Sequence, residues 1–240
     1  MQGLMCDRPL LISAIIEHAA TYQSDTEIVS RTVEGGIHRY TYAEAERRCK
    51  QLARALLRLG IEPGDRVGTL AWNTFRHFEL YYGISGIGAV CHTINPRLFD
   101  DQIVYIVNHA RDRLLFVDTS FVPLIERLAP QFPEDCRIVL MTAESTEPAT
   151  GLAKLPCYER LIDAENADFV WPEFDERTAA ALCYTSGTTG KPKGALYSHR
   201  STVLHAYAIC APNTIGLGMY EAICPIVPMF HVNEIGRAHV

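Results

Sequence analysis

The sequence predicts an α/β fold in which helices cover both faces of a mainly parallel sheet. From residue 66 to residue 141, short apolar runs alternate with longer segments of helical period, as in βαβ units. The short runs are apolar almost throughout, which is typical of strands that are buried on both faces. We therefore expect a layered α/β/α arrangement.

The order of elements follows from period and punctuation. Thr41 and Glu44 have the spacing of a capping box, and Gly60 is placed to end the helix that begins there. Glu34-Gly35-Gly36 separates two short β-type runs and predicts a hairpin. The predicted helices are 9–16, 42–59, 74–86, 100–110, 121–131, 158–164 and 201–210, and the predicted strands are 27–33, 37–40, 66–71, 89–94, 114–117, 137–141, 177–183 and 195–198.

Two features qualify this order. Between residues 142 and 157 the composition shifts to Ser, Thr, Pro, Gly and Glu without a hydrophobic period, which predicts a surface loop or subdomain boundary. The helix at 42–59 carries a basic stripe opposite its apolar face, and we interpret this stripe as a solvated face rather than a surface for an anionic partner. The stripe consists of Arg47, Arg48, Lys50, Arg54 and Arg58.

Composition and charge exclude one class of partner. Of the 240 residues, 48% are hydrophobic and 21% are charged, as in an ordinary globular protein, and the formal net charge is −6. Proteins that bind nucleic acids usually carry a basic surplus. We therefore expect no nucleic-acid partner.

Cysteine usage and hydropathy favour the cytoplasm. The eight cysteines are widely spread, with no Cys-x-x-Cys, as is typical of reduced core residues. Asp7 and Glu17 flank the apolar run at 9–16, which argues against a signal peptide. The uncharged stretches 80–96 and 201–220 contain polar residues and glycines, so we expect buried segments and no transmembrane segment.

Residues 184–194, Tyr-Thr-Ser-Gly-Thr-Thr-Gly-Lys-Pro-Lys-Gly, have the composition of a phosphate-binding loop. Glycines allow tight turns and a close approach of the backbone to a ligand. Hydroxyls, ammonium groups and successive backbone N–H groups then converge on one anion. An ordinary exposed turn needs only one or two Gly, Pro or Asn residues, so it explains this stretch poorly.

The loop is not of the Walker type. That design places four residues between its glycines and a Ser or Thr after the lysine, at the start of a helix. Here two residues separate Gly187 from Gly190, Pro192 takes the place of the hydroxyl, and 195–197 resembles a strand. A phosphate loop of another design is therefore predicted.

Three other patterns carry no chemistry. A dinucleotide fingerprint at Gly86 and Gly88 fails because Cys91 replaces the third glycine and the helix precedes the strand. The stretch 83–87 lacks the last glycine of a serine-hydrolase motif. No spacing of histidines, cysteines or carboxylates predicts a metal site. We interpret the glycines as the end of a helix that packs closely on the sheet.

The phosphate loop resembles a known family. Together with 197–201 (Tyr-Ser-His-Arg-Ser) and 228–233 (Pro-Met-Phe-His-Val-Asn), it is similar to the acyl-adenylate-forming (AMP-binding) superfamily, and most of all to its fatty-acyl-CoA synthetase branch. Residues 88–90 and 93–97 look like the family's early core motif. The resemblance runs from about Leu10 to Asn233 and implies a partial N-terminal domain over residues 1–233.

The resemblance implies an ATP-dependent acyl-CoA synthetase. In the intact enzyme, a carboxylic acid would attack the α-phosphorus of ATP and expel pyrophosphate, and coenzyme A would then displace AMP. ATP, Mg²⁺ and coenzyme A are the implied substrates and cofactor, and the family suggests a homodimer. The implied nucleotide contacts are Thr185, Ser186, Gly187, Thr188, Thr189, Gly190 and Lys193, with Lys191 a less direct neighbour.

His231 follows an apolar run, 223–227, that predicts a strand. From the residues alone, a core histidine is the more usual explanation. The matching position in the family lies near the acyl carboxylate and the adenylate. The resemblance therefore assigns His231 to substrate binding.

The resemblance breaks at Glu234. Ile235 stands where the fatty-acyl branch usually has a gating tryptophan, and 234–240 also translates a common sequencing-adapter sequence, so we expect a non-native tail. The family's magnesium-binding glutamate, catalytic lysine and C-terminal domain would lie beyond this chain. We therefore expect no turnover by the fragment itself. The alternatives are a non-catalytic nucleotide-binding fragment, an aryl-CoA ligase, a luciferase-like enzyme or a peptide-synthetase adenylation domain.

Overall fold

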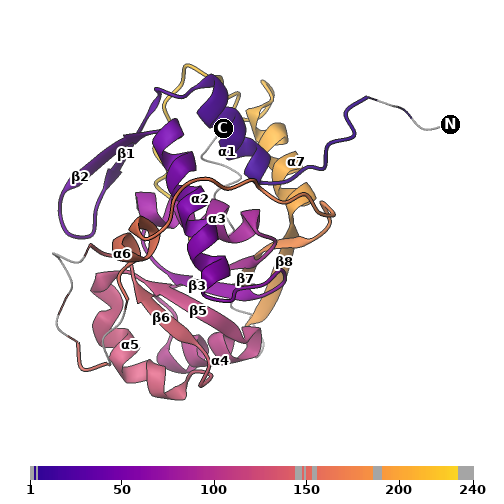
Figure 1. Cartoon of the computed structure of the whole chain (residues 1–240). Helices are drawn as coiled ribbons and strands as arrows, with labels where there is room; N and C mark the ends of the chain where they lie inside the picture. The colour runs from indigo at the N-terminus through magenta and orange to yellow at the C-terminus, as the bar shows by residue number, and fades with distance from the viewer. Residues whose placement is uncertain are drawn as a thin grey trace.

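A six-stranded sheet forms the centre of the molecule (Figure 1). The computed structural model describes residues 3, 5–143, 148, 150–152, 156–185 and 191–231. Strand order is β6-β5-β3-β4-β7-β8, with all neighbours parallel except β7 and β8. The strands are β3 (Arg66–Leu70), β4 (Val90–Thr93), β5 (Asp112–Val117), β6 (Arg137–Leu140), β7 (Ala179–Thr185) and β8 (Lys193–Ser198). The predicted mainly parallel α/β fold is confirmed.

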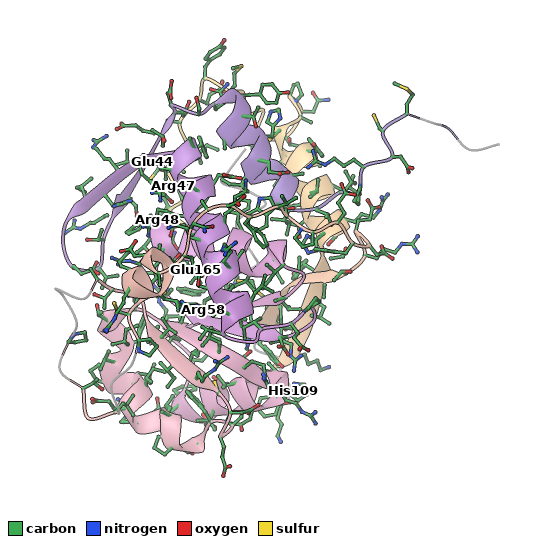
Figure 2. All side chains as sticks on the ribbon, viewed as in Figure 1. Glu44, Arg47, Arg48, Arg58, His109 and Glu165 are labelled. Atoms are coloured by element: carbon green, nitrogen blue, oxygen red, sulfur yellow. The ribbon has the colours of Figure 1, made fainter. Side chains whose placement is uncertain are left out.

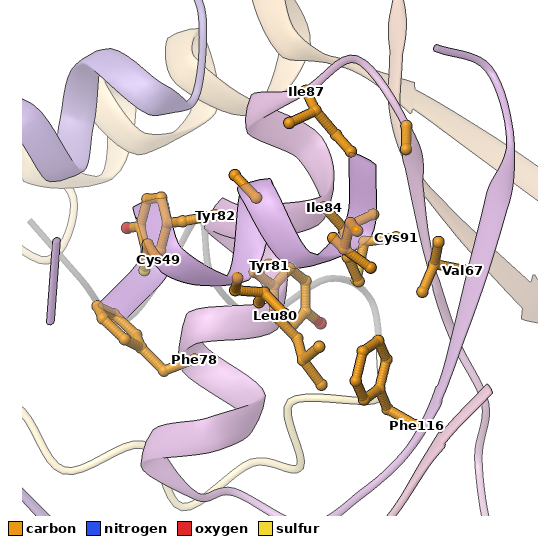
Figure 3. Close-up of a cluster of buried hydrophobic side chains, with 14 of the residues drawn as sticks. Cys49, Val67, Phe78, Leu80, Tyr81, Tyr82, Ile84, Ile87, Cys91 and Phe116 are labelled. Atoms are coloured by element: carbon orange, nitrogen blue, oxygen red, sulfur yellow. The ribbon is translucent and has the colours of Figure 1, made fainter. Parts of the chain in front are cut away.

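Helices cover both faces of this sheet, which gives the three predicted layers (Figure 1). One face packs against α1 (Ser13–Tyr22), α2 (Tyr42–Arg58), α3 (Phe75–Gly86) and α6 (Tyr158–Asp163), and the other against α4 (Asp100–Ala110) and α5 (Val122–Leu128). The first interface contains the large cluster of Figure 3, in which Val67 and Phe116 of the sheet meet Leu80 and Ile84 of α3. After β8 the chain forms α7 (His199–Cys210).

Two predicted helices differ from the structure. The first begins at Ser13, not at Pro9, and extends to Tyr22. The segment predicted as one helix at 121–131 is divided into η1 (Thr119–Phe121), α5 and η2 (Ala129–Gln131). Proline cannot donate the backbone hydrogen bond that continues a helix, so Pro130 explains why α5 stops at Leu128.

The hairpin of β1 (Glu27–Arg31) and β2 (Ile37–Thr41) lies outside the main sheet (Figure 1). It leads directly into α2 through the predicted capping box. The Thr41 N–H donates to Glu44 Oε2 at 2.8 Å, and the Glu44 N–H donates to Thr41 Oγ1 at 3.3 Å. Both hydrogen bonds of the predicted capping box are therefore present.

Glycines allow α3 to approach its neighbours closely. A Cβ on Gly83 would lie 2.5 Å from Leu52 Cδ2 of α2, and one on Gly86 would lie 2.3 Å from Trp171 Cζ3. Gly88 has φ +80°, the left-handed conformation that commonly ends a helix. These contacts agree with the close packing that the sequence suggested.

The basic stripe of α2 is not a plain solvated face, and this interpretation was wrong. The side chain of Arg48 is 12% exposed, and its guanidinium donates to both carboxylate oxygens of Glu79, at 2.7 and 3.1 Å. Arg58 pairs with Glu165 at 2.7 Å, and Arg54 approaches the same carboxylate (Figure 2). The stripe therefore meets acids of α3 and of the segment after α6.

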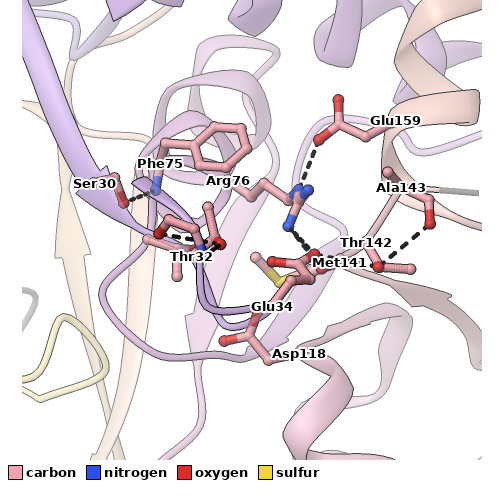
Figure 4. Close-up of polar contacts among 12 residues, drawn as sticks. Ser30, Thr32, Glu34, Phe75, Arg76, Asp118, Met141, Thr142, Ala143 and Glu159 are labelled. Carbon is pink, nitrogen blue, oxygen red and sulfur yellow. Dashed lines mark hydrogen bonds and ion pairs between the residues drawn. The ribbon is translucent and has the colours of Figure 1, made fainter. Parts of the chain in front are cut away.

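A second arginine extends this network. Arg76 Nε donates to Glu159 at 2.7 Å, and its Nη1 donates to Glu34 at 2.8 Å and to the carbonyl of Met141 at 3.1 Å (Figure 4). Glu159 also accepts from Arg48 at 3.0 Å. The network joins the hairpin, α2, α3 and α6, which are distant in sequence.

Candidate functional site

The hairpin of β7 and β8 places the two ends of the predicted phosphate loop next to each other. Thr185, the last residue of β7, is the register partner of Lys193, the first residue of β8. The Thr185 hydroxyl is 3.5 Å from the Lys193 carbonyl, a long hydrogen bond. The predicted contacts Ser186, Gly187, Thr188, Thr189 and Gly190 lie outside the described residues.

Both ends of the loop in this hairpin lie at the carboxyl ends of the parallel strands, where ligands usually bind in α/β sheets. The parallel strands β3 to β7 all end on this side of the sheet, and the antiparallel β8 starts there. The loop after β3 leads to α3 on one face, whereas the loops after β4 and β5 lead to the α4 and α5 face. In open α/β sheets, ligands bind outside the carboxyl ends where connections diverge in this way.

The two lysines of the loop differ in surroundings. Lys193 is exposed and forms no ion pair with any described residue. Lys191 Nζ lies 5.0 Å from the centre of the Tyr105 ring, a cation–π contact with α4. Among the described residues, Lys191 therefore contacts α4, whereas Lys193 forms no ion pair.

Gly194 is required by its neighbours across the hairpin. A Cβ at this position would lie 3.0 Å from Leu182 Cδ1 and 3.3 Å from Tyr184 Cζ. Both side chains belong to β7, so the last glycine of the loop motif permits the two strands to pair at this point. The spacing of the motif therefore reflects packing as well as ligand approach.

The predicted strand at 223–227 is absent from the structure, and this prediction was wrong. Instead of pairing with a strand, the carbonyls of Pro225 and Val227 accept hydrogen bonds from the Asn73 amide, at 3.1 and 2.9 Å. The Met229 N–H donates to Asn73 Oδ1 at 2.7 Å. An apolar run alone therefore did not determine a strand here.

The same contacts hold the segment before His231 across the end of β3. Met229 and Phe230 are buried, and the Phe230 ring lies 6.0 Å from that of Trp72. The Tyr81 hydroxyl donates to the Met229 carbonyl. The side chain of His231 itself is exposed. Sequence reasoning missed Asn73, although a polar residue in the loop that follows a predicted strand is a usable signal.

Asp118 is a second residue that sequence reasoning missed. It follows β5, and its Oδ2 accepts from the Trp72 N–H at 2.6 Å. Its Oδ1 is buried and has no hydrogen-bond partner among the described residues. Burial raises the pKa of Asp118 to about 7. Its neutral form is therefore stabilised, which fits a residue that anchors the loop after β3.

A metal centre built from protein side chains alone is not found among the described residues. Within them, no three His, Cys, Asp or Glu side chains are grouped so that they could bind one. No chemical step is therefore assigned to the Mg²⁺ that the family resemblance implies. Among the helices of the described ranges, none has both the length and the apolar character needed to cross a membrane.

Two curated proteins that are similar to this chain in sequence are both CoA ligases. The chain is 50% identical over 239 residues to a 3-methylmercaptopropionyl-CoA ligase of Ruegeria lacuscaerulensis. It is 46% identical over 239 residues to a medium-chain-fatty-acid–CoA ligase of Ectopseudomonas oleovorans. Each alignment covers 100% of this chain and 44% of the relative, so the chain spans less than half of their length.

A solved structure supports the fold. The long-chain-fatty-acid-CoA ligase of Archaeoglobus fulgidus superposes with a TM-score of 0.80 at 20% identity, over 96% of this chain and 45% of that one. The family model described as AMP-binding enzyme matches residues 16–238, which is most of the chain. On this match and on the relatives' identities, the chain belongs to the AMP-binding enzyme family, and the relatives named are acyl-CoA ligases.

Proposed function

We propose that the chain is the N-terminal part of an ATP-dependent acyl-CoA ligase and that the β7–β8 hairpin binds the triphosphate of ATP. This proposal rests on the hairpin of this chain, a member of the AMP-binding family. In it, Thr185 and Lys193 are register partners at the carboxyl ends of the parallel strands. Charge-assisted contacts at such a position are among the stronger polar interactions in proteins. The whole enzyme's activity remains a proposal, because the chain spans 44% of its relatives.

The residues of the loop would act by positioning and by neutralising charge. In the proposed reaction a carboxylate attacks the α-phosphorus of ATP, pyrophosphate leaves, and the thiol of coenzyme A then displaces AMP. Lys193 would balance negative charge on the β- and γ-phosphates, and Thr185 and the other loop hydroxyls would fix their orientation. No residue of this chain is assigned to the thiol-transfer step.

The acid is proposed to be aliphatic. One relative is named for a medium-chain fatty acid and another for 3-methylmercaptopropionate, a short thioether acid, at similar identities. A fatty acid is the first candidate and a thioether acid the second. His231 is proposed to contact the carboxylate, since the buried Met229 and Phe230 hold the segment before it across the end of β3.

Calorimetric titration of the 240-residue chain with ATP and Mg²⁺ tests the proposal. We expect Lys193→Met to weaken ATP binding at least about tenfold, which corresponds to about 1.4 kcal/mol. Lys50→Met is the matched control, because Lys50 pairs with Glu46 on α2, outside the hairpin. Equal affinity of both variants, or no binding by the wild-type chain, would contradict the proposal.

A second assay separates ligase from binding fragment. We expect the chain alone to catalyse no carboxylate-dependent exchange of pyrophosphate into ATP, because the family's catalytic lysine and magnesium-binding glutamate are expected beyond it. ATP binding without exchange would agree with this expectation. Exchange that depends on added octanoate or 3-methylmercaptopropionate would overturn it and would identify the acid.

A further inference from the structure

Tyr184 connects the entry to the phosphate loop with helix α4. Its hydroxyl is 2.7 Å from Nδ1 of His109, on the last turn of α4. Tyr184 directly precedes Thr185, so a contact that fixes the Tyr184 ring also restrains the backbone of Thr185. Figure 2 labels His109 on the side of the molecule where β8 lies.

The exit from the loop meets the same helix. Lys191 Nζ lies over the Tyr105 ring at 5.0 Å, and Tyr105 is one turn before His109 on α4. The rings of Tyr105 and His109 stack with centroids 5.2 Å apart and an interplanar angle of 27°. Two stacked rings on one helix face therefore contact both ends of the loop.

The ring of Tyr184 is also held from the sheet side. His92 of β4 lies beneath it, with ring centroids 5.2 Å apart. His92 Nδ1 is 2.8 and 2.9 Å from the two carboxylate oxygens of Asp112, and both side chains are fully buried. Gly194 leaves room for the ring on its other side, since a Cβ there would lie 3.3 Å from Tyr184 Cζ.

We propose that Tyr105 and His109 form a clamp on α4 that positions both ends of the phosphate loop for the triphosphate of ATP. This inference rests on the proposed function. The two residues are positioning residues, because the proposal has them act through Tyr184 and Lys191. Within this proposal, Lys191 is held against α4 by the Tyr105 ring, and Lys193 is the lysine that faces the phosphates.

Two pairs of variants separate the clamp from general packing. His109→Ala removes the contact to the Tyr184 hydroxyl, whereas His109→Gln retains a polar group that can reach it. Tyr105→Leu removes the aromatic face under Lys191, whereas Tyr105→Phe retains it. His205→Ala, at an exposed position on α7, is the control for histidine loss.

The first measurement needs no ligand. Hydrogen exchange of peptides that cover residues 179–198 is expected to accelerate severalfold in His109→Ala and Tyr105→Leu, and to stay near wild type in His109→Gln, Tyr105→Phe and the control. Peptides from β3 and β5 should be unaffected in all variants. Unchanged exchange in His109→Ala and Tyr105→Leu would overturn the clamp.

The second measurement is ATP affinity by calorimetry. We expect His109→Ala and Tyr184→Phe each to weaken binding about three- to tenfold, and the double variant to be no weaker than either alone, because both remove one contact. Additive losses would show that the two residues act separately and would overturn the proposed coupling. If the wild-type chain binds no ATP, the proposed function fails, and the hydrogen-exchange measurement alone decides whether the clamp exists.

Discussion

Glu79 shows how one buried charge is balanced. Its side chain has no exposed surface, and it accepts from Arg48 and from the Tyr158 hydroxyl, the latter at 2.7 Å. Burial raises the pKa of this carboxyl, while the adjacent guanidinium opposes the shift. A buried ion pair of this kind is costly to break because the remaining charge loses a buried partner, and among the described residues Arg48 would keep only Glu159 as an acidic partner, at 3.0 Å.

Glu79→Gln is therefore expected to lower the free energy of unfolding by about 3 kcal/mol. Urea denaturation monitored by circular dichroism measures the change. Asp135→Asn is the matched control, because the Arg113–Asp135 pair is exposed at 43% and 63% and should cost no more than about 1 kcal/mol. Similar losses in both variants would show that the burial of Glu79 is not what makes its pair important.

Residues close in sequence were the ones that could be predicted. Thr185 and Lys193 belong to one short motif, so the sequence alone could pair them, and the structure places them in register. The binding of phosphate by this motif stays a prediction. His109 was not identified, because its partner Tyr184 lies 75 positions away. A lone histidine at the end of a helix carries no signal until the fold brings a hydroxyl to it.

At the scale of elements, the pairing of α2 with α3 depends on a missing side chain. Gly83 faces Leu52, and an added Cβ would lie within 3.2 Å of three of its side-chain atoms. The two helices would have to separate, or Leu52 would have to leave its rotamer. Both outcomes disturb the larger hydrophobic cluster, to which Leu52 belongs.

We expect Gly83→Ala to destabilise the chain by about 1–3 kcal/mol, despite the better helix propensity of alanine. Urea unfolding and the melting temperature measure this effect. Gly36→Ala is the control: it lies in the β1–β2 turn, and its added Cβ would meet only Thr32 Oγ1 at an ordinary 3.6 Å. A stabilised Gly83→Ala variant would refute the close contact.

Elements were predictable where local signals and tertiary packing agree. The start of α2 was correct because the capping box of Thr41 and Glu44 forms within one turn. The strand predicted at 223–227 was wrong because hydrophobicity does not supply a partner, and Asn73 binds those carbonyls instead. The subdomain boundary at 142–157 stays a prediction, since much of it lies outside the described residues.

At the scale of the whole molecule, stability is expected to depend on pH through a buried histidine. His199 is fully buried, its Nδ1 accepts from the Ile12 N–H at 3.2 Å, and burial lowers its pKa to about 4. Between about pH 6.5 and 4 the unfolded chain binds a proton here that the folded chain does not. The contribution of His199 to stability is therefore lost as pH falls through this window.

The difference between wild type and His199→Asn isolates this contribution, because asparagine offers an acceptor near Nδ1 and does not titrate. Unfolding free energies measured from pH 7 to pH 4.5 should fall more steeply in the wild type, by up to about 1.4 kcal/mol per pH unit. Asp118, with its raised pKa, has the opposite slope in both proteins and cancels in the difference. Parallel pH profiles would show that His199 binds its proton equally in the folded and unfolded chain, so that its pKa is not lowered by folding.

The position of β8 at the end of the sheet has a consequence for handling the protein. Within the described structure β8 pairs only with β7, so its outer edge presents unpaired backbone groups, and Leu196 on this strand is 65% exposed. Such an edge is a template for strand addition and aggregation. The apparent molar mass of the wild type, measured by static light scattering, should therefore rise with concentration. Leu196→Lys should reduce this rise, because a charge on an edge strand opposes pairing. Equal apparent molar masses for both proteins at every concentration would place the self-association elsewhere.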